Sequence, residues 1–168
     1  YIGKSDLKSD NVSLTNDTLY CNLTSDEIGN LRDYVLGRAS DLGSIKHAVL
    51  SGYLSDADFS FLAALASAYQ LASLDMTNLQ STYSYRFQGC SQLREVKYSR
   101  YWNSTRFYLF EECANITKVE FPTNIIGGGY LKLDGGTFRG CTSLEEIRIP
   151  STVQSLGSQC FYLCSNLK

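Results

Sequence analysis

The chain has 168 residues, enough for one domain with a buried core and too few for two large ones. It carries 15 Lys and Arg residues against 17 Asp and Glu residues, and this formal net charge of −2 leaves no basic face for a nucleic-acid partner. The longest apolar stretch, residues 59–68, is shorter than the ~20 residues that span a bilayer, so no transmembrane segment is predicted.

The N-terminal region is predicted to contain a linker and one helix. Residues 1–17 are polar and indicate a linker or a loosely held strand. Residues 26–37 have apolar side chains at helical spacing, with Ser25 or Thr24 as the N-cap and Gly37 as a stop. We expect this helix to cover the first of several stacked repeats, because the end of such a stack otherwise exposes its core to water.

Two strands separated by a second helix follow. Residues 45–52 and 71–76 each have the pattern of a short strand. Between them, residues 55–69 place apolar side chains at helical spacing behind Ser55, which is well suited to cap the helix. The expected order is therefore strand, helix, strand.

A repeated motif fills the second half of the chain. Apolar residues and a cysteine fall in the same places in residues 87–98, 110–121 and 138–150, and a fourth copy begins at Phe161. Successive Phe positions lie 23, 28 and 23 residues apart. The extra residues of the longer copy lie around residues 127–130, where three glycines predict a loop insertion.

Each copy contains two apolar residues at a period of two, which predicts a short strand with one buried face. These pairs are Val96 and Tyr98, Val119 and Phe121, and Ile147 and Ile149. Such short strands cannot bury their apolar faces alone, but parallel stacking of successive copies builds a continuous core. The Phe, Cys and Leu residues between the strands are expected to turn inward on the return limb.

The motif Phe-x-x-Cys-x-x-Leu-x-x-Ile-x-Ile-Pro, clearest at residues 138–150, resembles the BspA-type leucine-rich repeats of surface proteins from Bacteroides-like bacteria. The resemblance covers residues 45–168, although Ser99 stands where the pattern has proline. It implies an α/β fold: a right-handed leucine-rich-repeat solenoid with short parallel strands on its concave face and an N-terminal helical cap. Residues 1–44 are then the linker and capping helix, and residues 45–168 the solenoid, whose last repeat is incomplete.

The resemblance also implies a role. Such proteins act in adhesion or in binding a host protein, with matrix and serum proteins as candidate partners, and this domain is not known for catalysis or for a cofactor. The expected location is outside the cell or on its surface, with a lipid anchor upstream of the sequence. A structural spacer or display stalk for another domain is the alternative function.

Four in-phase cysteines raise the question of a zinc site or disulfides. Cys90, Cys113, Cys141 and Cys164 occupy the same place in every copy. Stacked copies put such residues in a column ~4.8 Å apart, with parallel side chains that neither converge on an ion nor meet disulfide geometry. Buried free thiols are the favoured interpretation, with a metal or a disulfide as the alternatives.

The binding-site candidates are outward-facing residues of the predicted strands and of one loop. If the strand pairs point inward, two outward columns alternate in charge: Glu95, Lys118 and Glu146 in one, and Asp75, Lys97, Glu120 and Arg148 in the other. These charges either neutralise one another and fix the strand register, which we favour, or form a pattern for a partner.

The loop candidates come from the aromatic segment 98–110. Tyr101, Arg106 and Tyr108 are of residue types that dominate binding hot spots. Trp102 matches Val153 in the repeat alignment and is expected to point inward.

Catalysis is not predicted. The only histidine, His47, could be combined with Ser51 and Asp75 into a triad, but no sequence resembles a nucleophile elbow.

Overall fold

The computed structural model describes residues 10–81 and 86–168. The strands are β1 (Val12–Thr15), β2 (Thr18–Leu23), β3 (His47–Gly52), β4 (Ser73–Leu79), β5 (Glu95–Lys97), β6 (Lys118–Glu120), β7 (Leu131–Leu133) and β8 (Val153–Leu156). The helices are α1 (Leu31–Leu36), α2 (Asp56–Ala68) and the short 3-10 helix η1 (Leu42–Ser44).

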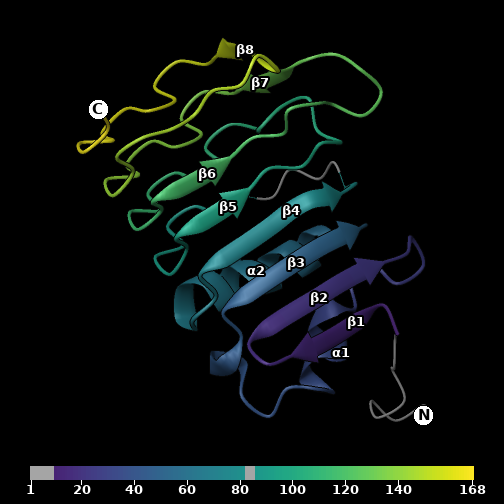
Figure 1. Cartoon of the computed structure of the whole chain (residues 1–168). Helices are drawn as coiled ribbons and strands as arrows, with labels where there is room; N and C mark the ends of the chain where they lie inside the picture. Colours follow the sequence, from purple (N-terminus) through teal and green to yellow (C-terminus); the bar gives the residue numbers. More distant parts are fainter. Residues whose placement is uncertain (1–9, 82–85) are drawn as a thin grey trace.

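Strands β1 to β6 form one mixed sheet in chain order, and β7 and β8 form a second sheet (Figure 1). Only β1 and β2 are antiparallel; the other neighbouring pairs are parallel. Helices α1 and α2 lie behind the larger sheet, on one of its faces (Figure 1). The fold is therefore α/β, as predicted.

The β1–β2 hairpin was not predicted. Strand β2 pairs with β3, so β1 forms the N-terminal edge of the sheet, within residues 1–17, which the sequence assigned to a linker or a loosely held strand. Leu19, Cys21 and Leu23 alternate inward and are almost fully buried. Polar residues around this strand obscure its alternation in the sequence, and the neighbouring strand β3 supplies the pairing that the short pattern alone does not indicate.

Helix α1 begins later than predicted. Gly29 has a φ of 86°, which interrupts the expected helix, and α1 starts only at Leu31. The Asp58 carboxylate of α2 accepts hydrogen bonds from the backbone N–H groups of Gly29 (2.6 Å) and Leu31 (3.0 Å). This tertiary contact replaces the local cap that Ser25 or Thr24 was expected to provide.

Helix α2 confirms its prediction. The Ser55 hydroxyl accepts from the backbone N–H of Asp58, and the Asp58 side chain accepts from the backbone N–H of Ser55, which completes a capping box. Phe59 and Leu62 on this helix are buried against the sheet core. A cap of this kind contributes about 1 kcal/mol to stability.

The repeated phenylalanines form a continuous stack. Neighbouring rings of Phe87, Phe110, Phe138 and Phe161 have centroids 5.7 to 5.8 Å apart and planes within 14° of parallel. The backbone N–H of Phe110 donates to the carbonyl of Thr137 in the next copy, and those of Phe87 and Phe138 do the same with Leu109 and Cys160. The predicted equivalence of the copies is confirmed.

The last predicted strand is not formed. Residues 147–149 have no strand pairing, Ile147 is half-buried and Ile149 is 40% exposed. Pairing continues instead on the opposite limb of the repeats, where β7 pairs with β8 and Ser104 forms a bridge with Lys132. The sequence pattern of this limb is too weak to have predicted a second sheet.

Candidate functional site

The charged columns of the larger sheet are linked by ion pairs. Asp75, Lys97 and Glu120 lie opposite one another on β4, β5 and β6. The Lys97 ammonium lies 3.8 Å from the Asp75 carboxylate and 3.9 Å from that of Glu120. One cation is thus shared between two acids.

The neighbouring column is joined to the first. Lys118 on β6 lies 2.9 Å from Glu95 and 2.8 Å from Glu120. Hydrogen bonds from its ammonium group to Glu120 and Glu95 raise the pKa of Lys118. On β4, β5 and β6, two lysines are thus paired with three acids, which supports the interpretation that these charges fix the strand register.

Glu146 and Arg148 lie apart from this network. Together with Lys118 and Glu120 they line an opening of about 620 Å³ between β6 and residues 146–148. Among the described residues, neither of the two forms an ion pair. The structure thus brings together five of the seven charged residues in the two predicted columns.

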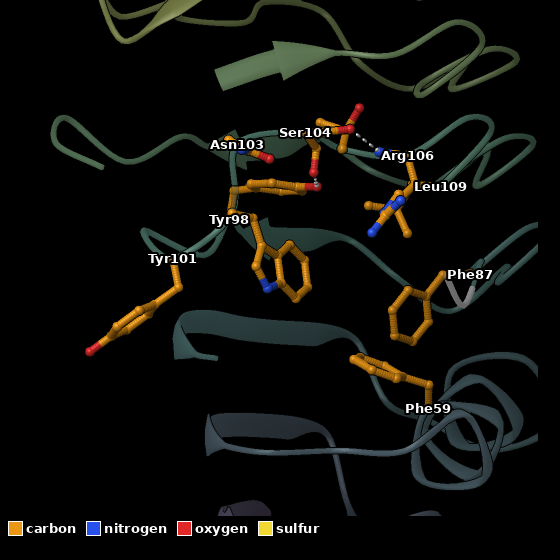
Figure 2. A pocket seen from close by; sticks show the side chains of 10 residues that line it. Phe59, Phe87, Tyr98, Tyr101, Asn103, Ser104, Arg106 and Leu109 are labelled. Carbon is orange, nitrogen blue, oxygen red and sulfur yellow. Dashed lines mark hydrogen bonds between the residues drawn. The ribbon is translucent and has the colours of Figure 1, made fainter. Parts of the chain in front are cut away.

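A pocket of about 220 Å³ lies beside the loop that connects β5 to the next copy (Figure 2). Its lining residues are Phe59, Phe87, Tyr98, Tyr101, Trp102, Asn103, Ser104, Thr105, Arg106 and Leu109. Phe59 comes from α2, Phe87 from the first clear copy of the repeat, and the rest from residues 98–109. Three segments distant in sequence therefore build one site.

Hydrogen bonds hold the loop side of the pocket in place. The Tyr98 hydroxyl donates to the carbonyl of Ser104 at 3.1 Å, and the Ser104 hydroxyl donates to Asp134. Burial raises the pKa of Tyr98 well above its ordinary value, so this hydroxyl stays a donor. For Asp134, burial raises the pKa, but hydrogen bonds with Ser104 and Lys132 outweigh it and leave the pKa below its ordinary value.

Aromatic rings and arginines gather at this site. The Trp102 indole meets the Tyr98 ring edge-on, with centroids 5.2 Å apart. The Arg100 guanidinium lies over the Tyr101 ring at 5.9 Å, and that of Arg86 over Tyr108 at 5.6 Å. Two buried N–H groups, Trp102 Nε1 and Arg100 Nε, have no hydrogen-bond partner in the described structure.

The in-phase cysteines form a column of hydrogen-bond donors. The thiols of Cys113, Cys141 and Cys164 each donate to the carbonyl of a phenylalanine one copy earlier, at 2.9, 3.3 and 3.1 Å. Cys90 donates to the carbonyl of Ala63 in α2 at 3.7 Å. All six cysteines of the chain are free and buried. The predicted buried column is confirmed.

The repeat geometry agrees with the comparison to known protein families. A family model described as BspA type leucine-rich repeat region matches residues 63–168 in six copies. The chain belongs to this family. No curated protein and no solved structure matches the chain.

The BspA-type match begins later than the predicted repeat region, residues 45–168. It starts inside α2, so the end of that helix and β4 belong to the matched repeats, whereas β3 lies outside them. Ser99 replaces the expected proline, and its hydroxyl donates to the buried carbonyl of Leu79 at 2.6 Å. This departure from the motif therefore adds a contact between copies.

The loop candidates of this BspA-type chain are only partly brought together. Tyr101 and Arg106 line the pocket, whereas Tyr108 lies outside it under Arg86. Trp102, expected in the core, is partly buried and also lines the pocket. Phe59 and Phe87 were assigned to the helix and the repeat by sequence, and only the folded arrangement reveals that they border the same space.

His47 contacts neither of the residues considered for a triad. Its Nδ1 lies 2.8 Å from the Ser73 hydroxyl, and its Nε2 lies 3.7 Å from Asp17. The side chains of His47 and Asp17 are 47% and 44% exposed, so water competes for both. Ser51 instead donates to the carbonyl of Cys21.

The described residues include neither a membrane-spanning helix nor a cluster of metal-binding side chains. No helix there is long and apolar enough to cross a membrane. No group of three or more His, Cys, Asp or Glu side chains there could hold a metal ion.

Proposed function

We propose that this chain is a non-catalytic protein-binding module displayed outside the cell, with a role in adhesion. The pocket at residues 98–109 is the observation that carries the proposal, because aromatic and arginine side chains around a preformed hollow are the usual anchors of protein interfaces. Membership of the BspA-type family supports a protein partner. Host matrix and serum proteins are the candidates.

The contact surface that we propose centres on Tyr101 and Arg106, with Tyr108 at its margin. The charged columns on the sheet then act mainly to fix the strand register. The repeats themselves wind as a right-handed solenoid over residues 45–168, and the described part of the N-terminal region, residues 10–44 with the β1–β2 hairpin and α1, covers its first end. The stacked phenylalanines support this arrangement.

A panel of immobilised matrix and serum proteins tests the function. We expect saturable binding of the chain to at least one of them, weakened at least tenfold by Tyr101→Ala and unchanged by Tyr130→Ala, which removes an exposed tyrosine from another loop. Measurements at low and raised salt separate specific binding from charge attraction. The absence of saturable binding to any protein would overturn the proposal.

That negative result would favour a structural spacer or display stalk. The paired charges on the sheet support this second function, because both lysines of β5 and β6 are already engaged with acids of β4 to β6.

A further inference from the structure

The pocket at residues 98–109 has the size of one aromatic ring. Its volume is about 220 Å³, and an apolar cavity of about 150 Å³ suffices to hold benzene. Figure 2 shows Tyr98 on one side of the space and Phe59 and Phe87 on the other, and Trp102 also lines it. Such surroundings favour edge-to-face and stacked contacts with a further ring.

The one charged side chain among the lining residues is a cation, Arg106, and it lies beside the neutral polar residues Asn103, Ser104 and Thr105. The buried Trp102 Nε1 can only donate a hydrogen bond, and it has no partner in the described structure. Arg106 lines the pocket, and Arg100 lies beside it against Tyr101 with its own Nε unpartnered. The nearby acid, Asp134, is already held by Lys132 at 3.1 Å and by Ser104.

These observations define the chemistry of an occupant. A ring fills the apolar space, and a carboxylate next to it is attracted by the positive charge of Arg106 at the pocket and of Arg100 beside it. We propose that the pocket takes an aromatic side chain of a protein partner, flanked in that partner by acidic residues. The proposal rests on the protein-binding function and names the partner chemistry at the same site.

Trp102 is the only tryptophan, so its fluorescence reports on this pocket directly. The probes are three capped peptides: Glu-Phe-Glu, Lys-Phe-Lys and Glu-Ala-Glu. We expect Glu-Phe-Glu to change the Trp102 emission saturably and to bind at least tenfold more tightly than either of the others. Equal binding of Lys-Phe-Lys would refute the acidic flank, and equal binding of Glu-Ala-Glu would refute the aromatic anchor.

Variants assign the effect to named side chains. Arg106→Gln and Arg100→Gln should each narrow the preference for Glu-Phe-Glu over Lys-Phe-Lys by several-fold. The matched control, Arg94→Gln, changes an exposed arginine just before β5 and should leave the preference intact. Near-ultraviolet circular dichroism checks that each variant keeps its fold, and a folded Arg106→Gln with Arg100→Gln double variant that retains the full preference would overturn the proposal.

Free phenylacetate distinguishes a protein side chain from a small molecule. Binding as tight as that of Glu-Phe-Glu would overturn the proposal in favour of a small aromatic acid. The two proposals also fail separately. If a protein from the panel binds and the arginine variants do not change its affinity, the pocket assignment is wrong while the function stands. If Glu-Phe-Glu binds but no protein of the panel does, the pocket assignment stands and the proposed function is wrong.

Discussion

Buried thiols in this chain connect one repeat to the next. Cys141 is fully buried, and its thiol donates to the carbonyl of Phe110. Burial raises its pKa from 9.0 to about 12, and the same cause raises the pKa of Cys160 to about 11. These groups therefore stay protonated in the folded chain at pH values where an unfolded chain would lose their protons.

A pH dependence follows from the raised pKa of Cys141. Stability linked to this thiol is fully present below pH 9, where both states hold the proton, and is lost as the pH rises toward about 12. Between pH 9 and about pH 12, the unfolding free energy should decline with pH less steeply in Cys141→Ala than in the unchanged chain. The expected difference in slope is about 1.4 kcal/mol per pH unit. Urea unfolding at several pH values on both sides of pH 9 measures the two slopes, and identical slopes would contradict the assignment.

Glu112 offers a second test at the scale of one residue. Its φ is 59°, in the left-handed region, at the place where two other copies have Gly89 (φ 68°) and Gly140 (φ 75°). This conformation costs a residue with a side chain about 1–2 kcal/mol. A glycine avoids that strain but loses more conformational entropy on folding, which offsets part of the gain. We expect Glu112→Gly to raise the unfolding free energy by about 0.5–1 kcal/mol. Glu112→Gln keeps the strain and is the control; an equal gain in both would point to charge instead.

At the scale of the elements, charge-reversal variants test whether the charged columns of the sheet fix the strand register or recognise a partner. Glu120→Lys places a third ammonium group beside Lys97 and Lys118, so it should lower the melting temperature at low salt, and raised salt should reduce the loss. Glu146→Lys makes the same charge change on a residue without an ion pair. If both variants melt alike while Glu120→Lys weakens partner binding, the columns serve recognition.

Element prediction succeeded where local signals and tertiary contacts agree. Helix α2 has its cap, its acidic first turn and its apolar face in one continuous segment, so the sequence was sufficient. Helix α1 failed at its start because Asp58, 27 residues beyond Leu31, supplies the hydrogen bonds there. Strands β7 and β8 depend on pairing across copies, and only a few alternating residues mark them in the sequence.

At the scale of the whole molecule, the phenylalanine stack spans the repeats. Phe110 is fully buried between Phe87 and Phe138, at 5.7 and 5.8 Å from their ring centroids. We expect Phe110→Ala to lower the unfolding free energy by about 3–5 kcal/mol, since it removes a large side chain from the core and leaves a cavity. Chemical denaturation measures the change. Phe107→Ala, at a 54% exposed ring, should cost far less, and a similar loss in both would contradict the stack's role.

The periodic part of the molecule could be predicted because each repeat restates the same pattern. The in-phase phenylalanines and cysteines were recognised from spacing alone, and the structure confirms their columns. The pocket could not be predicted in the same way. It depends on Phe59 and Phe87 lying next to a loop that follows a later strand, and this adjacency has no counterpart in the linear sequence.

The thiol contacts also give the array a direction. Every donor in the column reaches back toward the N-terminus, and the first of them meets the Ala63 carbonyl of α2. When the ribosome releases a new repeat, the acceptor for its cysteine has already been synthesised. We therefore expect the copies to settle one after another on helix α2 as the chain emerges.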